Sequence, residues 1–394
     1  MSEITFTSTG SKLIVNLEGY IDSANAAEVE KKINEIKDNN PCGSLELNCE
    51  NLKYMSSAGL RIVLRLKKSI PDTVVTNVSS EVYEIFDMTG FTEMMEIRKA
   101  FRTVSVEGCE IIGEGANGKV YRIDPDTIVK VYLNPDSLPE IERERELART
   151  AFVLGIPTAI PYDVVRIENG GYGSVFELLN AKSFAKLLQT GEKSVDEIAK
   201  MSVDLLKLIH STVVKPDSVP DMKTVAIKWA NFLKDYLPED KFNKLSKLVQ
   251  DVPDDMHMMH GDYHIKNVML QNGEVLLIDM DTICHGHPVF ELASMYNAYL
   301  GYTELDHSIA MSFLGIPYET AVELWQKSLS LYLGTDDEKL LSSVEDKAKL
   351  LGYTRIMRRS IKRKGFDSPV GKAEIENAKN HILELLSTVD SLIW

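Results

Sequence analysis

The chain has 394 residues, of which 44% are hydrophobic and 26% charged, a composition of folded globular domains that excludes disordered, collagen-like and disulfide-framework proteins. Its 44 Lys and Arg residues are outnumbered by 59 Asp and Glu, and the net charge of −15 disfavours nonspecific binding to nucleic acid or to an anionic membrane. Because the chain has no long apolar run, no apolar leader after Met1 and four scattered Cys residues, we expect a cytoplasmic protein.

The first hundred residues alternate short strand and helix patterns, and the length of the chain predicts two or three domains. Residues 12–21 carry apolar side chains at every second position, as in a strand with one buried face. Asp22 and Ser23 then offer the cap of a helix, and strand and helix patterns alternate again over residues 44–90. This alternation is typical of a compact α/β domain.

The segments GYIDS at 19–23, YMSSAGL at 54–60 and FDMTGF at 86–91 resemble the STAS domain, the fold of bacterial anti-sigma factor antagonists, and the resemblance covers about residues 1–103. In those antagonists a partner kinase phosphorylates a serine at the start of the helix after the central strand, and the resemblance places that serine at Ser57. An ordinary helix cap at Ser56 or Ser57 is the alternative. The resemblance also implies a protein partner.

A glycine-rich loop between two strand patterns opens the second region, with glycines at Gly113, Gly115 and Gly118. Glycine lets backbone amides approach phosphate oxygens without interference from a Cβ atom. A Rossmann fingerprint would need a helix directly after the glycines, and a P-loop would need Ser or Thr where Val120 stands. The pattern favours the hairpin loop of kinases, and a plain glycine hairpin stays open as the alternative.

A lysine, Lys130, lies in the middle of the next strand pattern, residues 127–132. A lysine among apolar residues needs an anionic partner, because burying an unpaired charge is costly. The helix pattern over residues 140–151 offers Glu144 beside its apolar face, with Glu146 as the second choice. We expect a Lys130–Glu144 ion pair, and a solvated charged helix is the alternative.

Polar side chains occur in two later motifs, HGDYHIKN and LLIDMD. Asp262 and Asn267 are five residues apart in a loop pattern, and Asp279 follows a strongly apolar strand where packing does not explain a carboxylate. Magnesium prefers such hard oxygen ligands together with phosphate oxygens. The sequence therefore predicts a magnesium–phosphate site, with His260 bracing the loop through hydrogen bonds.

These ordered motifs resemble the aminoglycoside phosphotransferase and choline kinase branch of the protein-kinase-like fold, over about residues 107–394. The resemblance implies an α+β domain with a small lobe over 107–179 and a helical lobe over 180–394, and it implies ATP and Mg²⁺ as cofactors. It makes Asp262 the catalytic base, Asn267 and Asp279 the magnesium ligands, Lys130 with Glu144 the phosphate-binding pair, Gly113, Gly115 and Gly118 the loop over the phosphates, and Glu177 and Leu179 the hinge that binds adenine through backbone groups.

The function expected from these parts is transfer of the γ-phosphoryl group of ATP to a hydroxyl of a small-molecule acceptor, with the STAS domain as a regulatory or partner-binding module. Two alternatives are a protein-serine kinase and a nucleotide-sensing regulator in a STAS and anti-sigma pathway. The sequence does not identify the acceptor.

One late segment departs from the acidic character of the chain. Residues 353–366 contain six Lys and Arg residues and no acid. Helical periodicity places Arg355, Arg358, Arg359 and Lys362 on one face. A solvated basic face is one interpretation, and a site for a phosphorylated or carboxylated acceptor, or for an acidic partner, is the other.

Overall fold

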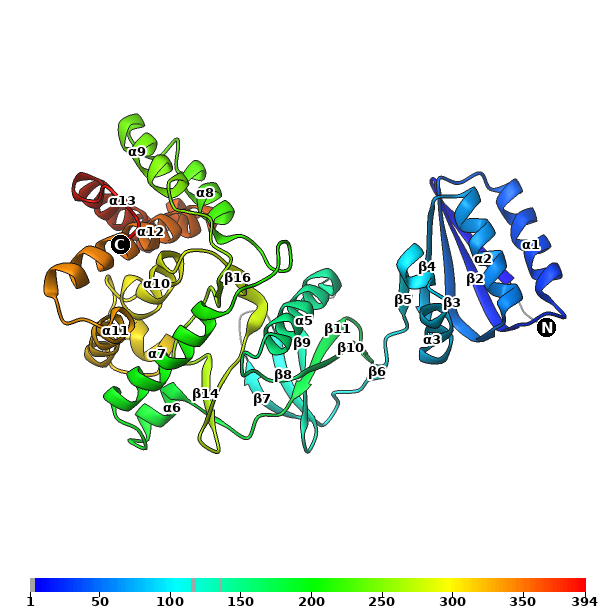
Figure 1. Ribbon diagram of the computed structural model, residues 1–394, viewed down its shortest axis with the longest axis horizontal. Helices are drawn as coiled ribbons and strands as arrows, with labels where there is room; N and C mark the ends of the chain where they lie inside the picture. The colour runs from blue at the N-terminus through cyan, green and yellow to red at the C-terminus, as the bar shows by residue number, and fades with distance from the viewer. Residues whose placement is uncertain (1–3, 115–117, 135–136) are drawn as a thin grey trace. The chain divides into compact units, whose positions relative to one another are not determined.

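A computed structural model describes residues 4–114, 118–134 and 137–394. The chain divides into two compact units, Met1–Val104 and Ser105–Trp394 (Figure 1). Each unit has a hydrophobic core of its own. The expected order of an α/β unit followed by an α+β unit is confirmed.

The N-terminal unit is built on a five-stranded sheet in the order β1-β2-β3-β4-β5, in which only the β1–β2 pair is antiparallel. Alternate residues of β2, among them Leu13 and Val15, are buried, as the period-2 pattern predicts. Helices α1 and α2 lie side by side against the sheet (Figure 1). The elements are β1 (Ile4–Thr9), β2 (Lys12–Ile21), α1 (Ala26–Asn39), β3 (Ser44–Met55), α2 (Ser57–Ser69), β4 (Asp72–Val78), α3 (Ser80–Met88), α4 (Phe91–Met94), β5 (Ile97–Lys99) and β6 (Thr103–Val104).

The second unit begins with an antiparallel sheet whose strands follow one another in the order β10-β11-β9-β8-β7. Helix α5 packs against β10 and β11 through a buried face that includes Ile141, Leu147 and Ala151. The elements are β7 (Glu110–Glu114), β8 (Gly118–Asp124), β9 (Thr127–Tyr132), α5 (Leu138–Val153), β10 (Pro161–Ile167) and β11 (Tyr172–Glu177).

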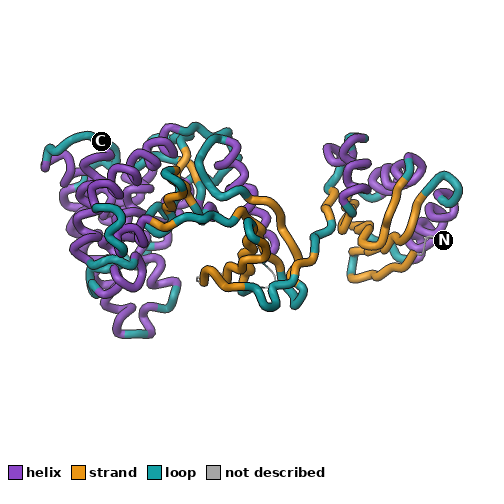
Figure 2. Tube along the Cα trace, turned by 90° about the horizontal axis from the view of Figure 1, so that it is seen from below, coloured by secondary structure: helices purple, strands orange, loops and turns teal. Residues whose placement is uncertain are grey.

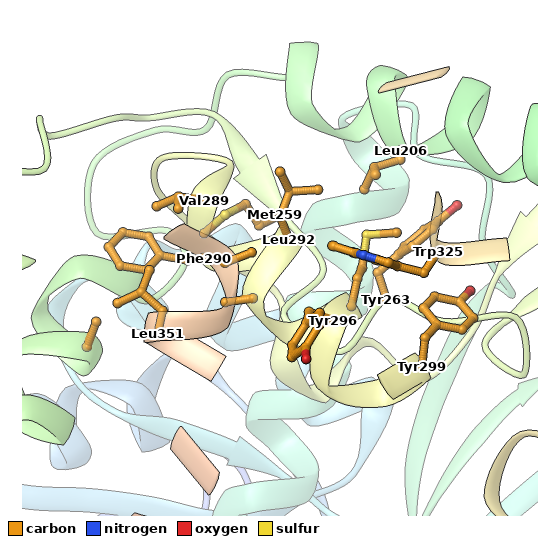
Figure 3. Packing of buried hydrophobic residues seen from close by; sticks show 14 of the residues in the cluster. Leu206, Met259, Tyr263, Val289, Phe290, Leu292, Tyr296, Tyr299, Trp325 and Leu351 are labelled. Atoms are coloured by element: carbon orange, nitrogen blue, oxygen red, sulfur yellow. The ribbon is translucent and has the colours of Figure 1, made fainter. Parts of the chain in front are cut away.

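The remainder of this unit is mostly helical (Figure 2). Aromatic side chains such as Tyr263, Tyr299 and Trp325 fill its core (Figure 3). Over the part of the chain that the structure describes, no helix is both long enough and apolar enough to cross a bilayer. The elements are β12 (Lys182–Ser183), α6 (Phe184–Gln189), α7 (Val195–Ser211), α8 (Met222–Phe232), α9 (Glu239–Gln250), β13 (Met258–Met259), β14 (Val268–Gln271), β15 (Glu274–Leu277), η1 (Met280–Thr282), β16 (Cys284–His285), α10 (Val289–Tyr296), η2 (Asn297–Gly301), η3 (Ala310–Leu314), α11 (Tyr318–Leu333), α12 (Glu338–Lys362), η4 (Gly365–Asp367) and α13 (Pro369–Thr388).

Candidate active site

The hairpin of β14 and β15 brings two sequence-predicted polar residues to the same end. Its antiparallel register pairs Val268 with Leu277. The next residues outward therefore face each other, and the backbone N–H of Ile278 donates to the carbonyl of Asn267 at 2.9 Å. Asp279 follows directly, so Asn267 and Asp279 lie at one end of the hairpin although they are twelve residues apart in sequence.

Asp279 has an unusual backbone conformation for a residue other than glycine. Its φ of 63° lies in the left-handed region, which Asp tolerates better than most residues because its short polar side chain can hydrogen-bond locally. Its side chain is 44% exposed, and its carboxylate lies 3.1 Å from the Nζ atom of Lys130. The turn thus directs a carboxylate from the helical lobe to a lysine on β9.

Lys130 is held by two carboxylates. Its Nζ atom lies 2.8 Å from the Oε1 atom of Glu144, which is only 6% exposed on α5. The hydroxyl of Tyr132 donates to the other oxygen of the same carboxylate. Burial alone would lower the pKa of Lys130, but Asp279 and Glu144 raise it above its ordinary value, so the ammonium group stays charged.

The loop that contains Asp262 is braced by its neighbours. The imidazole of His260 accepts a hydrogen bond from the backbone N–H of Asp262 at 3.3 Å and donates to the carbonyl of Ile278 at 3.2 Å, which confirms the expected bracing role. Gly261 has a φ of +82°, and a Cβ atom there would lie 2.5 Å from the carbonyl oxygen of Thr282. Only glycine allows this loop to approach η1 so closely.

The carboxylate of Asp262 is an ionised, partly exposed acceptor. Its side chain is 40% exposed, with one oxygen 3.6 Å from the Nε2 atom of His264. Burial alone would raise the pKa of Asp262, but the hydrogen bond from His264, followed by the charge of Arg355, holds it below its ordinary value. The side-chain amide of Asn267 donates to the backbone carbonyl of Asp262 at 3.0 Å and joins the two residues.

Glu291 on α10 supports this loop and was not predicted from the sequence. Its carboxylate is 1% exposed and accepts hydrogen bonds from the backbone N–H groups of His260 and Gly261, the latter at 3.0 and 3.1 Å. Burial alone would raise the pKa of Glu291, but His210, His260 and the Gly261 amide hold it below its ordinary value. A single acid in the apolar run VFELASMY was the signal that could have revealed it.

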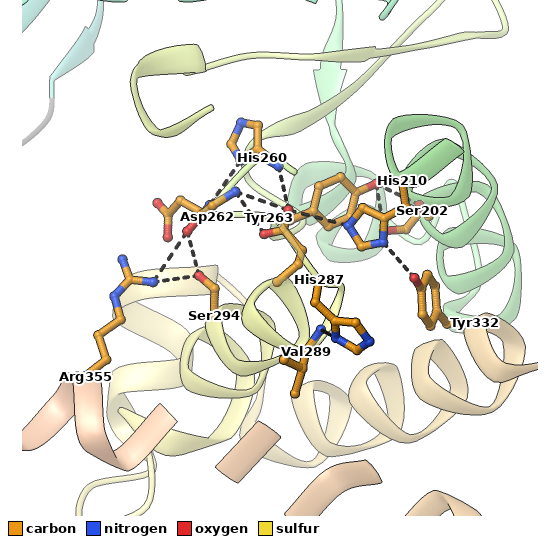
Figure 4. Close-up of polar contacts among 12 residues, drawn as sticks. Ser202, His210, His260, Asp262, Tyr263, His287, Val289, Ser294, Tyr332 and Arg355 are labelled. Atoms are coloured by element: carbon orange, nitrogen blue, oxygen red, sulfur yellow. Dashed lines mark hydrogen bonds and ion pairs between the residues drawn. The ribbon is translucent and has the colours of Figure 1, made fainter. Parts of the chain in front are cut away.

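A second missed support comes from α10 and α12. The hydroxyl of Ser294 donates to the carbonyl of Gly261 at 2.8 Å, and the Nη1 atom of Arg355 donates to that hydroxyl at 2.8 Å. The same nitrogen lies 3.4 Å from the carbonyl of Gly261. Figure 4 shows Arg355 and Ser294 converging beside Asp262. The basic helix predicted from the sequence is thereby attached to the loop of the candidate base.

The strands on either side of the glycine loop, β7 and β8, pair antiparallel, with Glu114 opposite Lys119. A Cβ atom on Gly118 would lie 2.1 Å from the carbonyl oxygen of Val131, so this position requires glycine. Gly113 lies in β7, and Gly115 lies outside the described residues.

The expected hinge lies at the end of β11. The backbone N–H of Glu177 donates to the carbonyl of Ile160 at 3.0 Å, and that of Leu178 donates to the carbonyl of Asp126 at 2.8 Å. Among the described residues, Leu179 has no hydrogen-bond partner. Its backbone N–H and C=O could therefore bind the edge of a base.

The donor set fits magnesium bound together with phosphate. Asn267 and Asp279 supply hard oxygens. Burial, followed by the neighbouring charge of Asp279, raises the pKa of Asp281. Over residues 4–114, 118–134 and 137–394, no three His, Cys, Asp or Glu side chains form a metal site by themselves. Magnesium at this position would take its other ligands from phosphate oxygens and water, as it commonly does.

Ser57 in the N-terminal unit is exposed at the first position of α2. Ser56 occupies the cap position, but its side chain makes no capping hydrogen bond, and its buried Oγ atom has no partner within the described structure. Tyr20 and Tyr54, which pair in the register of β2 and β3, are exposed near the same end of the sheet. An exposed serine beside exposed aromatic rings suits a surface that other proteins contact.

The fold and the site together define a kinase-like phosphotransferase domain that follows a STAS domain. The chain belongs to the phosphotransferase enzyme family, whose model matches residues 108–315. The STAS domain model matches residues 3–105.

Relatives of known name are similar to each part of the chain. A putative anti-sigma factor antagonist, BtrV of Bordetella bronchiseptica, is 29% identical over 99 residues, which are 24% of this chain and 84% of that protein. The anti-sigma F factor antagonist of Paenibacillus polymyxa is 30% identical over 89 residues, 22% of this chain and 76% of that protein. A thermostable mutant of aminoglycoside phosphotransferase APH(4)-Ia, in a ternary complex with AMP-PNP and hygromycin B, shares the fold with a TM-score of 0.50 at 13% identity, over 72% of this chain and 94% of that chain.

Proposed function

We propose that the protein is an ATP-dependent phosphotransferase that moves the γ-phosphoryl group to a hydroxyl of a small-molecule acceptor. The observation that carries this proposal is the contact of Lys130 with both Glu144 and Asp279, beside the loop that holds Asp262 and Asn267. A lysine and a magnesium-binding carboxylate are the parts that cradle nucleotide phosphates in kinases. The nucleotide analogue named for the APH(4)-Ia complex agrees with this use of the fold.

Each residue then has one role in the transfer. Lys130, fixed by Glu144, binds the α- and β-phosphates, and Asn267 with Asp279 holds magnesium, which when bound neutralises charge on the phosphates. Asp262 accepts the proton of the acceptor hydroxyl, whose oxygen forms the new P–O bond as the bond to ADP breaks. Positioning and electrostatic stabilisation supply most of the acceleration.

Replacing Asp262 and Asp279 tests these roles, because the two variants should fail at different steps. Asp262→Asn should retain magnesium-dependent binding of AMP-PNP in calorimetric titration, while turnover falls about 10²- to 10⁴-fold. Asp279→Ala should lose the magnesium-dependent part of the binding itself. Asp240→Asn on the exposed surface of α9 is the control. Unimpaired magnesium-dependent binding by the Asp279 variant would remove Asp279 from its role.

A second candidate function is a kinase of protein serine, and the exposure of Ser57 at the start of α2 favours it. The similarity of the N-terminal unit to proteins named as anti-sigma factor antagonists supports a partner-binding role for this unit in either case. We prefer the small-molecule acceptor and assign Tyr20, Tyr54 and Ser57 to partner recognition.

A further inference from the structure

The basic face of α12 is lined by aromatic rings from other elements. We define it by Arg355, Arg358, Arg359 and Lys362. The cationic groups of these side chains lie 4.8 to 5.8 Å from the ring centroids of Trp229, Phe232 and Tyr302, with Phe232 beneath both Arg358 and Lys362. A guanidinium group above a ring has its face covered, while its N–H groups point along its edge. Such an arrangement fixes the donors that carboxylate and phosphate groups accept in pairs.

The charges of the basic face lack carboxylate partners. Within the described part of the chain, none of its four side chains forms an ion pair with Asp or Glu. The three arginines are half-buried, and Lys362 is exposed. Burial and then the charge of Arg355 lower the pKa of Arg358, as expected for cations crowded without a counter-ion. The guanidinium groups of all three arginines nevertheless lie over aromatic rings, and a face of independently solvated side chains does not require such contacts.

The first residue of the basic face, Arg355, lies beside the loop that holds the candidate catalytic base, Asp262. Arg355 bonds Ser294 and approaches the carbonyl of Gly261, the residue before Asp262, and its charge contributes to the low pKa of Asp262. Arg358 and Arg359 follow one turn later along α12, about 5 Å further at 1.5 Å per residue, and Lys362 lies about one turn beyond. The basic face therefore extends about 10 Å along α12 from the turn that contacts the Asp262 loop, a length that suits a small molecule.

We infer that the acceptor is a small hydroxyl compound that carries a phosphate or carboxylate group, and that the basic face of α12 binds this anionic group while Asp262 receives the hydroxyl. This inference rests on the proposed function and specifies its acceptor. A polycationic acceptor such as an aminoglycoside would be repelled by the same four cations, since none of them forms an ion pair with Asp or Glu among the residues that the structure describes.

The binding test uses the full chain saturated with magnesium and AMP-PNP, so that added anions cannot occupy the nucleotide position. Glycerol phosphate and gluconate are titrated by calorimetry against their neutral counterparts, glycerol and sorbitol, which separates phosphate from carboxylate as the recognised group. We expect at least one anion to bind measurably better than its neutral counterpart. Arg358→Gln with Arg359→Gln should weaken that binding about tenfold or more, and Lys362→Gln, at an exposed position, should weaken it without loss of the fold.

Arg363→Gln with Lys364→Gln is the matched control, since it removes the same charge from exposed positions just beyond α12. Equal weakening by both double variants would assign the effect to general electrostatics and overturn the inference. The inference also fails if neither anion binds better than its neutral counterpart, or if polyglutamate binds in place of the small anions. It fails as well if, in a parallel assay with ATP in place of AMP-PNP, kanamycin stimulates ADP formation and the anions do not. If the wild-type protein did not bind AMP-PNP with magnesium, the proposed function itself would be contradicted. Failure of the proposed function is therefore distinguishable from failure of the acceptor inference.

Discussion

Lys130 contacts two carboxylates whose surroundings differ. Glu144 is buried on α5 and receives a second hydrogen bond from Tyr132, whereas Asp279 is 44% exposed on a turn. A buried carboxylate that lost its cation would incur the full cost of desolvation, while an exposed one would be rehydrated. Glu144 is therefore the permanent partner of Lys130, and under the proposed function Asp279 is the carboxylate that would hold magnesium.

Glu144→Gln tests this difference because it keeps the shape of the side chain and removes its charge. The amide cannot neutralise Lys130, so we expect the free energy of unfolding to fall by about 1–3 kcal/mol and the affinity for magnesium and AMP-PNP to fall about tenfold. Urea unfolding and calorimetric titration measure the two effects. Glu146→Gln, two residues along α5 at a side chain that is 63% exposed and paired with Arg149, should change neither. Equal effects of the two variants would contradict the assignment of Glu144.

At the scale of elements, the candidate active site depends on hydrogen bonds between α10 and the loop that holds Asp262. Glu291 accepts two backbone N–H groups of the Asp262 loop, and Ser294, one turn further along α10, bonds the carbonyl of Gly261. One helix thus satisfies both donors and an acceptor of the loop. Because these groups are buried, their hydrogen bonds fix the conformation of the loop.

Glu291→Gln should disturb catalysis more than nucleotide binding. The amide replaces one of the two oxygens that the Gly261 N–H contacts with an NH2 donor, so two donors face each other, and we expect the free energy of unfolding to fall by about 1–3 kcal/mol. Turnover should fall more than the affinity for AMP-PNP, because the loop carries Asp262. Glu376→Gln, at an exposed position on α13, is the control. A change in nucleotide affinity with normal turnover would be inconsistent with a role in positioning Asp262.

The same residue gives a pH dependence with a defined sign. The pKa of Glu291 is held below its ordinary value in the folded protein, so its ionisation stabilises the fold above the pKa of an unfolded Glu, about 4.3. That stabilisation is lost as the pH falls through the folded pKa. In acid titrations of the melting temperature, the wild type should lose this contribution below about pH 4, and Glu291→Gln should lack that part of the slope.

Sequence patterns predicted the presence of helices and strands better than the residues at which these elements begin and end. The alternation over residues 12–21 predicted β2 correctly, but the helix expected after Asp22 and Ser23 begins at Ala26. The carboxylate of Asp22 accepts the backbone N–H groups of Ala24 and Asn25, which forms a turn before the helix instead of capping it. Local hydrogen bonding of this kind competes with a cap and is not visible in an apolar pattern.

The candidate site likewise contains residues that the sequence predicted and residues that it missed. Lys130, Asp262, Asn267 and Asp279 lie in motifs with recognisable spacing, so the sequence could nominate them. Glu291 acts on Gly261 across 30 residues of sequence. The sequence could not supply such a contact, because it depends on how α10 packs against the loop. A residue such as Glu291, which acts by bonding the backbone of other residues, is only weakly indicated by the sequence. The indication here is an acid within an apolar run.

For the whole molecule, the two units have separate cores and separate functional surfaces. The N-terminal core is formed by residues such as Val15, Leu47 and Phe86, and none of its members belongs to the core of the second unit. The N-terminal unit presents Ser57, Tyr20 and Tyr54, while the second unit contains the candidate active site. Covalent linkage alone does not couple the two surfaces. The surface of the N-terminal unit can control activity in the second unit only if a partner binds it or a modification changes it.

Ser57 allows that link to be tested. Its hydroxyl stands on the first turn of a folded helix between buried Met55 and Leu60, so the flanking chain cannot extend into an acceptor site without breaking the core. We therefore predict that the protein incubated with ATP and magnesium leaves Ser57 unmodified, and that a separate kinase is needed to phosphorylate it. A phosphate added there would be stabilised by the N-terminus of α2 and would place negative charge beside Tyr54, which would alter partner binding. Mass spectrometry of the wild type, Ser57→Ala and Asp262→Asn locates the phosphate. Phosphate on Ser57 in the wild type that disappears in Asp262→Asn would show self-modification and refute the prediction.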